Sequence, residues 1–193
     1  MVILGVDPGL ATVGFGVVLA DGGQPRSIEA GIIQTSPATP LPERLAQIYT
    51  ALRDLSRRHR VGEFAVEELF FAKNPRMALQ VGQARGVVLL AAGESKIPVY
   101  EYTARQVKMA LTGYGQAEKR QVQLLVQRTL SLAEPPRPDD CADALAIAIC
   151  HVHSRLARRK MEEAGVLVPG PGRRGADPPT ARRLKALIRR AVA

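Results

Sequence analysis

The chain lacks the features that mark membrane and secreted proteins. No stretch approaches the roughly 18 consecutive apolar residues that a membrane-spanning helix needs. The N-terminus has neither the basic start nor the small-residue cleavage site of a secretory signal. Cysteine is scarce: Cys141 and Cys150, nine residues apart in one apparently helical stretch, are the only two. They point to opposite faces of that helix, which excludes a disulfide between them. These absences predict a cytoplasmic protein.

Negative charge is scarce in only one part of the chain. Of the formal net charge of +9, residues 1–153 carry +1, whereas residues 154–193 hold 11 Lys and Arg against three Asp and Glu. This excess predicts a polyanionic partner. A Pro/Gly-rich linker over residues 166–179 precedes a short basic stretch. We therefore expect a domain over residues 1–160 and a flexible extension over residues 161–193, which either contacts phosphates without specificity or folds on DNA or a partner protein.

Apolar runs and turn signals predict an α/β fold. The first third suits a three-stranded antiparallel meander, and the rest alternates helices with two more buried strands. Parallel strands joined by such crossovers need helices on the faces of the sheet. The predicted strands are Val2–Val6, Gly14–Ala20, Ser27–Thr35, Glu63–Phe70 and Ile97–Tyr102; the predicted helices are Leu41–His59, 75–94, 104–112, 117–131 and Asp139 to about Lys160, with Asp139 or Asp140 as the N-terminal cap of the last.

Acidic residues stand at three places where a core-forming pattern does not favour them. Asp7 ends the first strand, Glu67 stands near the end of the fourth beside a second glutamate, and Asp140 and Asp143 share one face of the last helix. If strands one and four are parallel neighbours, their carboxyl ends bring these acids together. Acids so close repel unless cations neutralise them, and Mg²⁺ prefers oxygen ligands. Two such ions about 4 Å apart can clamp both oxygens of a phosphodiester displacement.

Each acid also has an ordinary structural explanation. The DPG sequence that contains Asp7 is typical of a turn, and the acids of the last helix suit the positive end of its dipole. Glu67 and Glu68 point to opposite sides of a strand, so only one of them is expected to be a ligand. The spacing leaves open whether Asp139 or Asp140 points inward. The joint placement, in a chain whose charge suits a polyanion, favours the metal site.

Several blocks resemble one known family when they are taken together. These are "LGVDPGLATVGFGVV", "AVEELFFAKN", "ALQVGQARGVVLLAA", "VYEYTARQVKMALTGYGQAEKRQVQ" and "RPDDCADALAIAICH". In this order, over about residues 1–155, they resemble the RuvC family of Holliday junction resolvases. The resemblance implies an RNase H-like fold, with a mixed five-stranded sheet in the order 3-2-1-4-5 flanked by helices. It also implies a homodimer that resolves four-way DNA junctions by paired symmetric nicks in recombination and repair.

The resemblance implies a catalytic and metal-binding set as well. The family's acids fall on Asp7, Glu67 (not Glu68), Asp140 and Asp143. Asp7 is expected to bridge two Mg²⁺ ions per site, for which Mn²⁺ can substitute. Glu67 is expected to hold one ion and Asp143 the other, with Asp140 adjoining. The products implied are 5′-phosphate and 3′-hydroxyl ends.

DNA contacts are implied by the same resemblance. Lys108 and Lys119 match basic residues that face the scissile phosphates, and Phe70 matches an aromatic that stacks on unpaired bases. Arg76 and Arg85 are further candidates for phosphate contact. Ordinary explanations exist here too, because lysines are usually solvated surface residues and a Phe beside a strand usually packs in the core.

The sequence also bears on the partners of the protein and on alternative functions. The helix over residues 75–94 is apolar around much of its circumference and contains small residues, which suits either a core or a dimer interface. The family resemblance implies the dimer, and it points to the RuvA–RuvB branch-migration complex as a further partner. The alternatives are a YqgF-like nuclease of the same fold that acts on RNA, and a junction-binding protein without catalysis. An actin-like ATPase would need a longer chain.

Overall fold

A computed structural model of the protein describes residues 1–68 and 75–166, with only the backbone of residues 75–77. Five strands form one sheet in the order β3-β2-β1-β4-β5, which confirms the predicted order. Their bounds are β1 Val2–Asp7, β2 Thr12–Leu19, β3 Arg26–Gln34, β4 Glu63–Glu67 and β5 Val99–Tyr102. The first three strands pair antiparallel, whereas β1 with β4 and β4 with β5 pair parallel.

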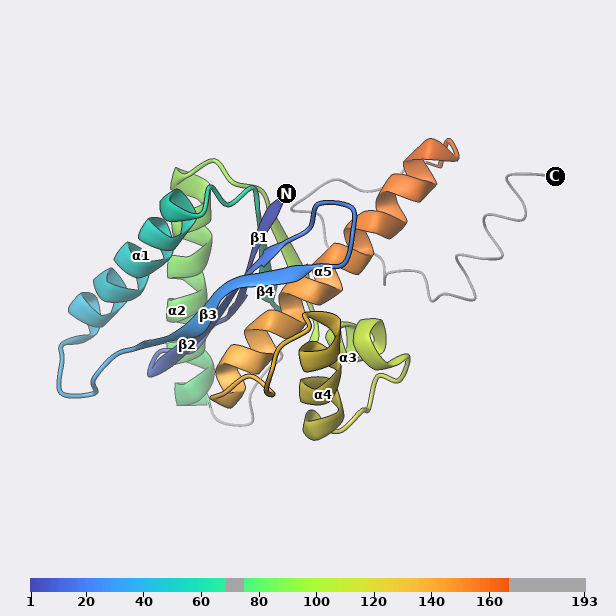
Figure 1. The fold of residues 1–193 in the computed structure, drawn as a ribbon. Coiled ribbons are helices and arrows are strands. Elements are labelled where there is room, and N and C mark those ends of the chain that lie inside the picture. Colours follow the sequence, from blue (N-terminus) through green and yellow to red (C-terminus); the bar gives the residue numbers. More distant parts are fainter. Residues whose placement is uncertain (69–74, 167–193) are drawn as a thin grey trace.

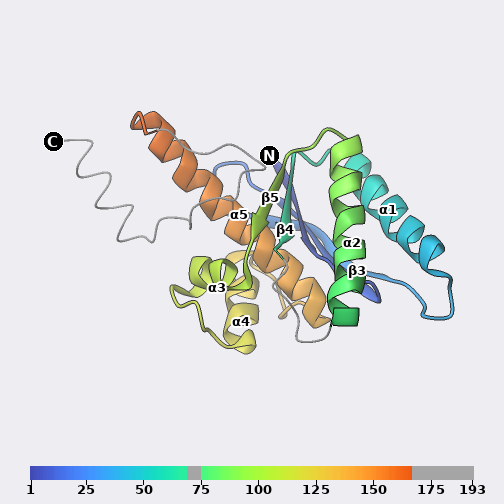
Figure 2. The same ribbon diagram turned by 180° about the vertical axis from the view of Figure 1, so that it is seen from behind.

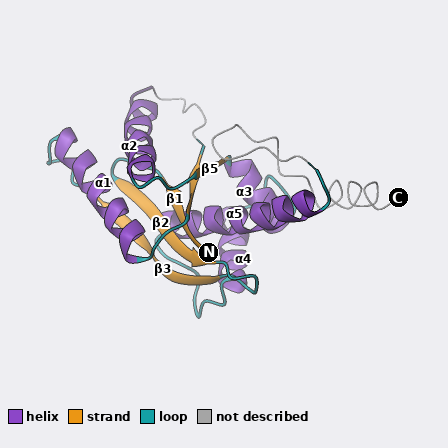
Figure 3. Ribbon diagram, turned by 90° about the horizontal axis from the view of Figure 1, so that it is seen from above, coloured by secondary structure: helices purple, strands orange, loops and turns teal. Residues whose placement is uncertain are grey.

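Two layers of helices cover the sheet (Figures 1 and 2). α1 and α2 lie on one face, and α3, α4 and α5 lie on the other, as the view from above shows (Figure 3). The bounds are α1 Leu41–Arg58, α2 Pro75–Glu94, α3 Ala104–Thr112, α4 Lys119–Thr129 and α5 Asp139–Glu163. Within the described part of the chain, no helix is long and apolar enough to cross a membrane.

The central strands are buried on both faces, which explains why they read as continuous apolar runs. Leu4 and Val6 of β1 pack with Ile48 and Leu52 of α1, whereas Ile3 of β1 packs with the α5 layer. Each fully buried aliphatic side chain contributes about 1.5–3 kcal/mol. Alternation along β1 therefore decides which residues face α5, and it places Asp7 on the same side as Ile3.

Glycines let α5 lie unusually close to the sheet. A Cβ atom added at Gly14 in β2 would collide with the carbonyl oxygen of Asp140, and one added at Gly5 in β1 would collide with that of Ala144. α5 contacts both β1 and β2 along its buried first half. Because Gly5 and Gly14 have no side chain, α5 can lie close enough to the sheet for its acids to approach the end of β1.

Several predicted bounds differ from the structure by a few residues, and two differences bear on the site. β4 ends at Glu67, whereas the predicted strand ran to Phe70. Neither Asp139 nor Asp140 caps α5: Pro138 holds the cap position in an extended conformation, and its carbonyl oxygen accepts the backbone N–H groups of Cys141 and Ala142. Because Asp139 is already helical, its carboxylate is free to contact other side chains.

Both cysteines are free and buried, as the spacing predicted. Most of the predicted extension, residues 167–193, lies outside the described residues. The division into a domain over residues 1–160 and a flexible tail over residues 161–193 stays a prediction, and α5 itself continues to Glu163.

Candidate active site

Three chain segments bring acids to one edge of the sheet. β1 and β4 are parallel with Val6 opposite Val66, so Asp7 and Glu67 follow at the same edge. Asp7 also lies opposite Gly14, the residue over which the first turn of α5 passes. The α5 acids Asp140 and Asp143 are close enough to Asp7 for their charges to act on it.

The electrostatics of this cluster are those of excess negative charge. Burial, followed by the charge of Glu67 and a hydrogen bond with it, raises the pKa of Asp7 to about 8, with smaller contributions from Asp143 and Asp140. Burial also raises the pKa of Glu67, and the charge of Asp143 adds to this, against the hydrogen bond with Asp7 and the attraction of Lys119. Two adjoining carboxyls that share a proton form a site that a cation would stabilise.

Lys119 is the cation that meets this cluster. Its Nζ lies 3.0 Å from Asp143 Oδ2 and 3.2 Å from Asp139 Oδ2. Partial burial opposes the charged form of Lys119, but hydrogen bonds and attraction from Asp143 and Asp139 raise its pKa above the ordinary value. In this arrangement, no three His, Cys, Asp or Glu side chains of residues 1–68 and 78–166 are placed to hold one ion together. Asp143 forms an ion pair with Lys119, whereas Asp7 forms a hydrogen bond with Glu67.

The chemistry of the donors nevertheless suits a hard divalent cation. All four acids offer oxygen ligands, and burial together with neighbouring carboxylates raises the pKa values of Asp7 and Glu67, which a bound cation would offset. A divalent cation would replace the shared proton between Asp7 and Glu67 and compete with Lys119 for Asp143.

A pocket of about 190 Å³ opens beside these acids. Its charged lining residues are Glu67, Asp143, Lys108 and Lys119. The structure thus brings together both lysines for which the family resemblance implied phosphate contacts, on α3 and α4. Its apolar lining is Ala104, Val107, Val122, Ala146 and Ile147. Paired acids and paired lysines in one pocket are suited to a phosphate group and its counter-ions.

Other candidate residues lie away from this pocket. Arg85 of α2 forms an ion pair with Glu101 of β5. Phe70 and the side chain of Arg76 lie outside the described residues. Glu68 follows the end of β4, where its backbone N–H donates to Tyr102.

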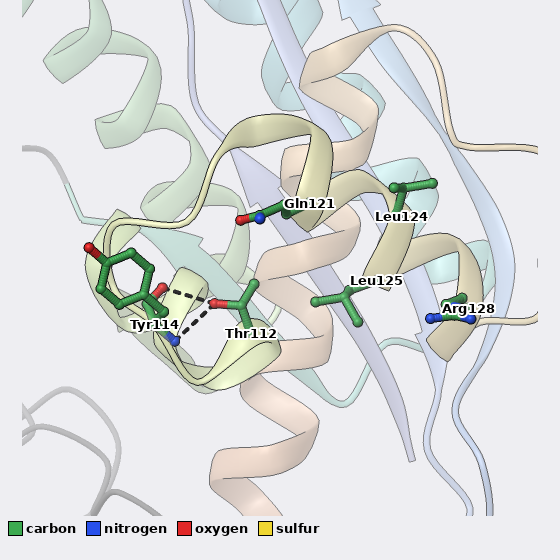
Figure 4. A pocket seen from close by; sticks show the side chains of 6 residues that line it. All are labelled: Thr112, Tyr114, Gln121, Leu124, Leu125 and Arg128. Carbon is green, nitrogen blue, oxygen red and sulfur yellow. Dashed lines mark hydrogen bonds between the residues drawn. The ribbon is translucent and has the colours of Figure 1, made fainter.

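A larger, more open pocket of about 410 Å³ lies along α4 (Figure 4). Leu124 and Leu125 line it together with Arg128, and the Thr112 hydroxyl bonds the backbone of Tyr114 at its rim. No acid lines this pocket, so it offers no carboxylate for a cation. Its size does not make it the reactive site.

Sequence reasoning missed a buried hydrogen-bond chain behind the site. The Tyr102 hydroxyl donates to Nδ1 of the fully buried His151 at 2.6 Å, and His151 Nε2 bonds Glu63 at 2.8 Å. Burial lowers the pKa of His151, and Arg155 lies 3.3 Å from the same Glu63 oxygen. These hydrogen bonds connect β4 and β5 to α5, two helical turns beyond Asp143. Glu63 and His151 are 88 residues apart, and no sequence pattern connects them.

Comparisons with known proteins agree on one family. A family model described as "Crossover junction endodeoxyribonuclease RuvC" matches residues 3–151. The protein of that name from Pelotomaculum thermopropionicum is 52% identical over 162 residues, which cover 84% of this chain and 99% of the relative. The one from Chloroflexus aggregans is 56% identical over 151 residues, covering 78% and 92%. A solved structure, RuvC of Thermus thermophilus in complex with Holliday junction substrate, matches with a TM-score of 0.78 and 43% identity, covering 83% of this chain and 96% of the other.

Proposed function

The chain belongs to the RuvC family of crossover junction endodeoxyribonucleases, and from this membership we propose the chemistry of its carboxylate pocket. Like its relatives, it is a nuclease that resolves four-way DNA junctions. The observation that carries the proposal is the convergence of Asp7, Glu67 and Asp143 beside two lysines, within the matched residues 3–151.

Nucleases of this family are metal-dependent, and we assign the metal ligands to the four acids. Asp7 interacts with Glu67 and with both α5 acids, so its carboxylate would be shared between two Mg²⁺ ions, with Glu67 holding one and Asp143 and Asp140 the other. Mn²⁺ would substitute, since it accepts the same oxygen ligands. When bound, such ions lower the pKa of an attacking water and offset the charge that develops on the leaving oxygen.

The chain's own residues supply the rest of the chemistry. Lys108 and Lys119 line the pocket from α3 and α4 and would hold the scissile phosphate against the acids by charge attraction. The apolar lining limits free water around the reacting groups. The products would carry 5′-phosphate and 3′-hydroxyl ends, which a ligase can join.

Further DNA contacts are proposed for residues outside the pocket. Phe70 would stack on an unpaired base at the crossover, an interaction worth about 1–3 kcal/mol. Arg76 would contact a phosphate. Arg85 would do so only by exchanging its ion pair with Glu101 for one with DNA. The basic residues of the tail would add salt-dependent affinity.

Paired nicks require two active sites, and we propose a homodimer formed through α2. Leu79 and Leu90 are 65% and 55% exposed. Gly82, Gly86 and Gly93 lie on the same side of α2, and a Cβ atom at any of them would meet open space. This side would let a second copy of the helix approach closely. The RuvA–RuvB branch-migration complex is a proposed further partner.

A nicking assay on a synthetic four-way junction tests the proposal. The wild-type protein should cut two opposing strands symmetrically in Mg²⁺, with no cutting in chelator and little cutting of a linear duplex of the same sequence. Asp7→Asn should bind the junction normally and leave it intact. Near-normal nicking by Asp7→Asn would refute the assignment of the acids.

The same assay separates the rival functions. Binding of the junction by the wild-type protein without any cleavage would favour the non-catalytic alternative. Preferential cleavage of an RNA substrate would favour a YqgF-like activity, for which the matched crossover junction endodeoxyribonucleases give no support.

A further inference from the structure

The proposed site leaves one neighbouring acid without a role. Asp139, the first residue of α5, precedes the proposed ligand Asp140. Its side chain is 62% exposed, and it is absent from the lining of the carboxylate pocket. Its Oδ1 accepts a hydrogen bond from Gln123 Nε2 at 2.9 Å, and its Oδ2 lies 3.2 Å from Lys119 Nζ. The carboxylate is thus held in place by two side chains of α4.

Lys119 forms ion pairs with one acid that lines the pocket and with one that lies outside it. One partner, Asp143 at 3.0 Å, is a pocket wall and a proposed metal ligand, whereas the other, Asp139, stands outside. Lys119 is also the first residue of α4, where the positive end of the helix dipole disfavours a cation. The position of its ammonium group therefore depends on its two acidic partners.

A divalent cation would change the balance between the two ion pairs of Lys119. An ion bound by Asp143 would draw on the same carboxylate that Lys119 contacts through Oδ2, and its charge would repel the ammonium group. Asp139 lies outside the pocket and is fixed by Gln123, so it keeps its charge for Lys119 when Asp143 is taken. With no second partner, Lys119 would compete with the ion for Asp143 or turn away into water.

We propose that Asp139 is a positioning residue: it retains the Lys119 ammonium at the rim of the pocket when a divalent cation takes Asp143, and so keeps Lys119 within reach of the scissile phosphate. This inference rests on the proposed function, because it takes Asp143 as a metal ligand and Lys119 as a phosphate contact. It makes Asp139 act through Lys119, which is a testable dependence.

A double-mutant cycle on cation affinity tests that dependence without DNA. Mn²⁺ binding is measured by calorimetry for the wild-type protein, Asp139→Asn, Lys119→Gln and the double variant. With Lys119 present, Asp139→Asn should weaken binding about two- to fivefold, the range expected for losing an exposed ion pair. With Gln at position 119, Asp139→Asn should change the affinity no more than Glu134→Gln, a control that removes one exposed charge before α5.

Single-turnover cleavage at saturating protein gives the second readout. Asp139→Asn should slow it about two- to fivefold without changing junction affinity in chelator, and Asp139→Glu should recover part of the rate. Equal effects of Asp139→Asn in both backgrounds, or no effect with Lys119 present, would overturn the role of Asp139. If the wild-type protein binds no divalent cation, or Asp7→Asn binds it equally well, the proposed function itself fails and this inference with it.

Discussion

Replacing Asp7 by Asn should stabilise the cation-free protein while it abolishes cleavage. The pKa of Asp7 is raised from 3.8 to about 8, chiefly by burial and by Glu67. Each unit of difference between the folded and unfolded pKa is worth about 1.4 kcal/mol. At pH 7 the unfolded chain ionises Asp7 freely whereas the folded protein resists it, which costs at most about 4 kcal/mol. Burial of Glu67 remains in the variant, so we expect a gain of about 1–3 kcal/mol.

The sign of the pH dependence follows from the same difference. The folded protein binds the Asp7 proton more tightly than the unfolded chain, so this group makes stability fall as pH rises from about 4 to about 8. Asp7→Asn should remove that slope. Mg²⁺ should stabilise the wild-type protein increasingly as the pH rises, because the ion binds the ionised carboxylate.

Urea unfolding in chelator at several pH values measures both effects. Asp54→Asn is the matched control, since it removes an exposed carboxylate on α1 whose nearest basic partner lies 3.4 Å away. A free energy of unfolding of Asp7→Asn at or below that of the wild-type protein, with the control unchanged, would show that burial and Glu67 do not make ionised Asp7 costly in the folded protein.

Three further perturbations probe the fold and the assembly. Gly14→Ala should cost roughly 1–3 kcal/mol and slow cleavage, because its Cβ would push α5 outward. Gly23→Ala, whose Cβ would make only an ordinary 3.6 Å contact with Asp21, should be neutral or slightly stabilising in thermal unfolding. Burial lowers the pKa of His151, so its contribution to stability is complete above about pH 6.5 and is lost as the pH falls below that value. His151→Gln should flatten the pH dependence of urea-unfolding stability below about pH 6.5, and an unchanged slope would contradict this. Leu90→Glu should weaken a dimer through α2 at least about tenfold in analytical ultracentrifugation, and an unchanged dimer would place the interface elsewhere.

Much of the fold and the candidate site could be predicted from sequence, because alternation and strand ends are local signals. The apolar run before Asp7 and the crossover to Glu67 predict parallel neighbours whose ends meet, and the structure confirms that pairing. The close approach at Gly14 also had a signal, in the glycines of "GFG", but its consequence depends on how α5 packs.

Contacts between distant segments of the chain could not be predicted from the sequence. Lys119 meets Asp139 and Asp143 only because α4 and α5 pack side by side, and no spacing rule relates residues on two helices. The prediction that Asp139 or Asp140 caps α5 was wrong for a related reason. Pro138 holds the extended cap position, and the Asp139 carboxylate contacts α4 instead.

Binding of divalent cations tests the central claim, that acids from β1, β4 and α5 form a single metal site. Calorimetric titration of Mn²⁺ into the wild-type protein, Asp7→Asn, Glu67→Gln and Asp143→Asn measures it without DNA. Each single substitution should weaken binding at least about tenfold, because each removes a charged oxygen ligand from the same ions. Wild-type affinity in any one of the three variants would contradict a shared site.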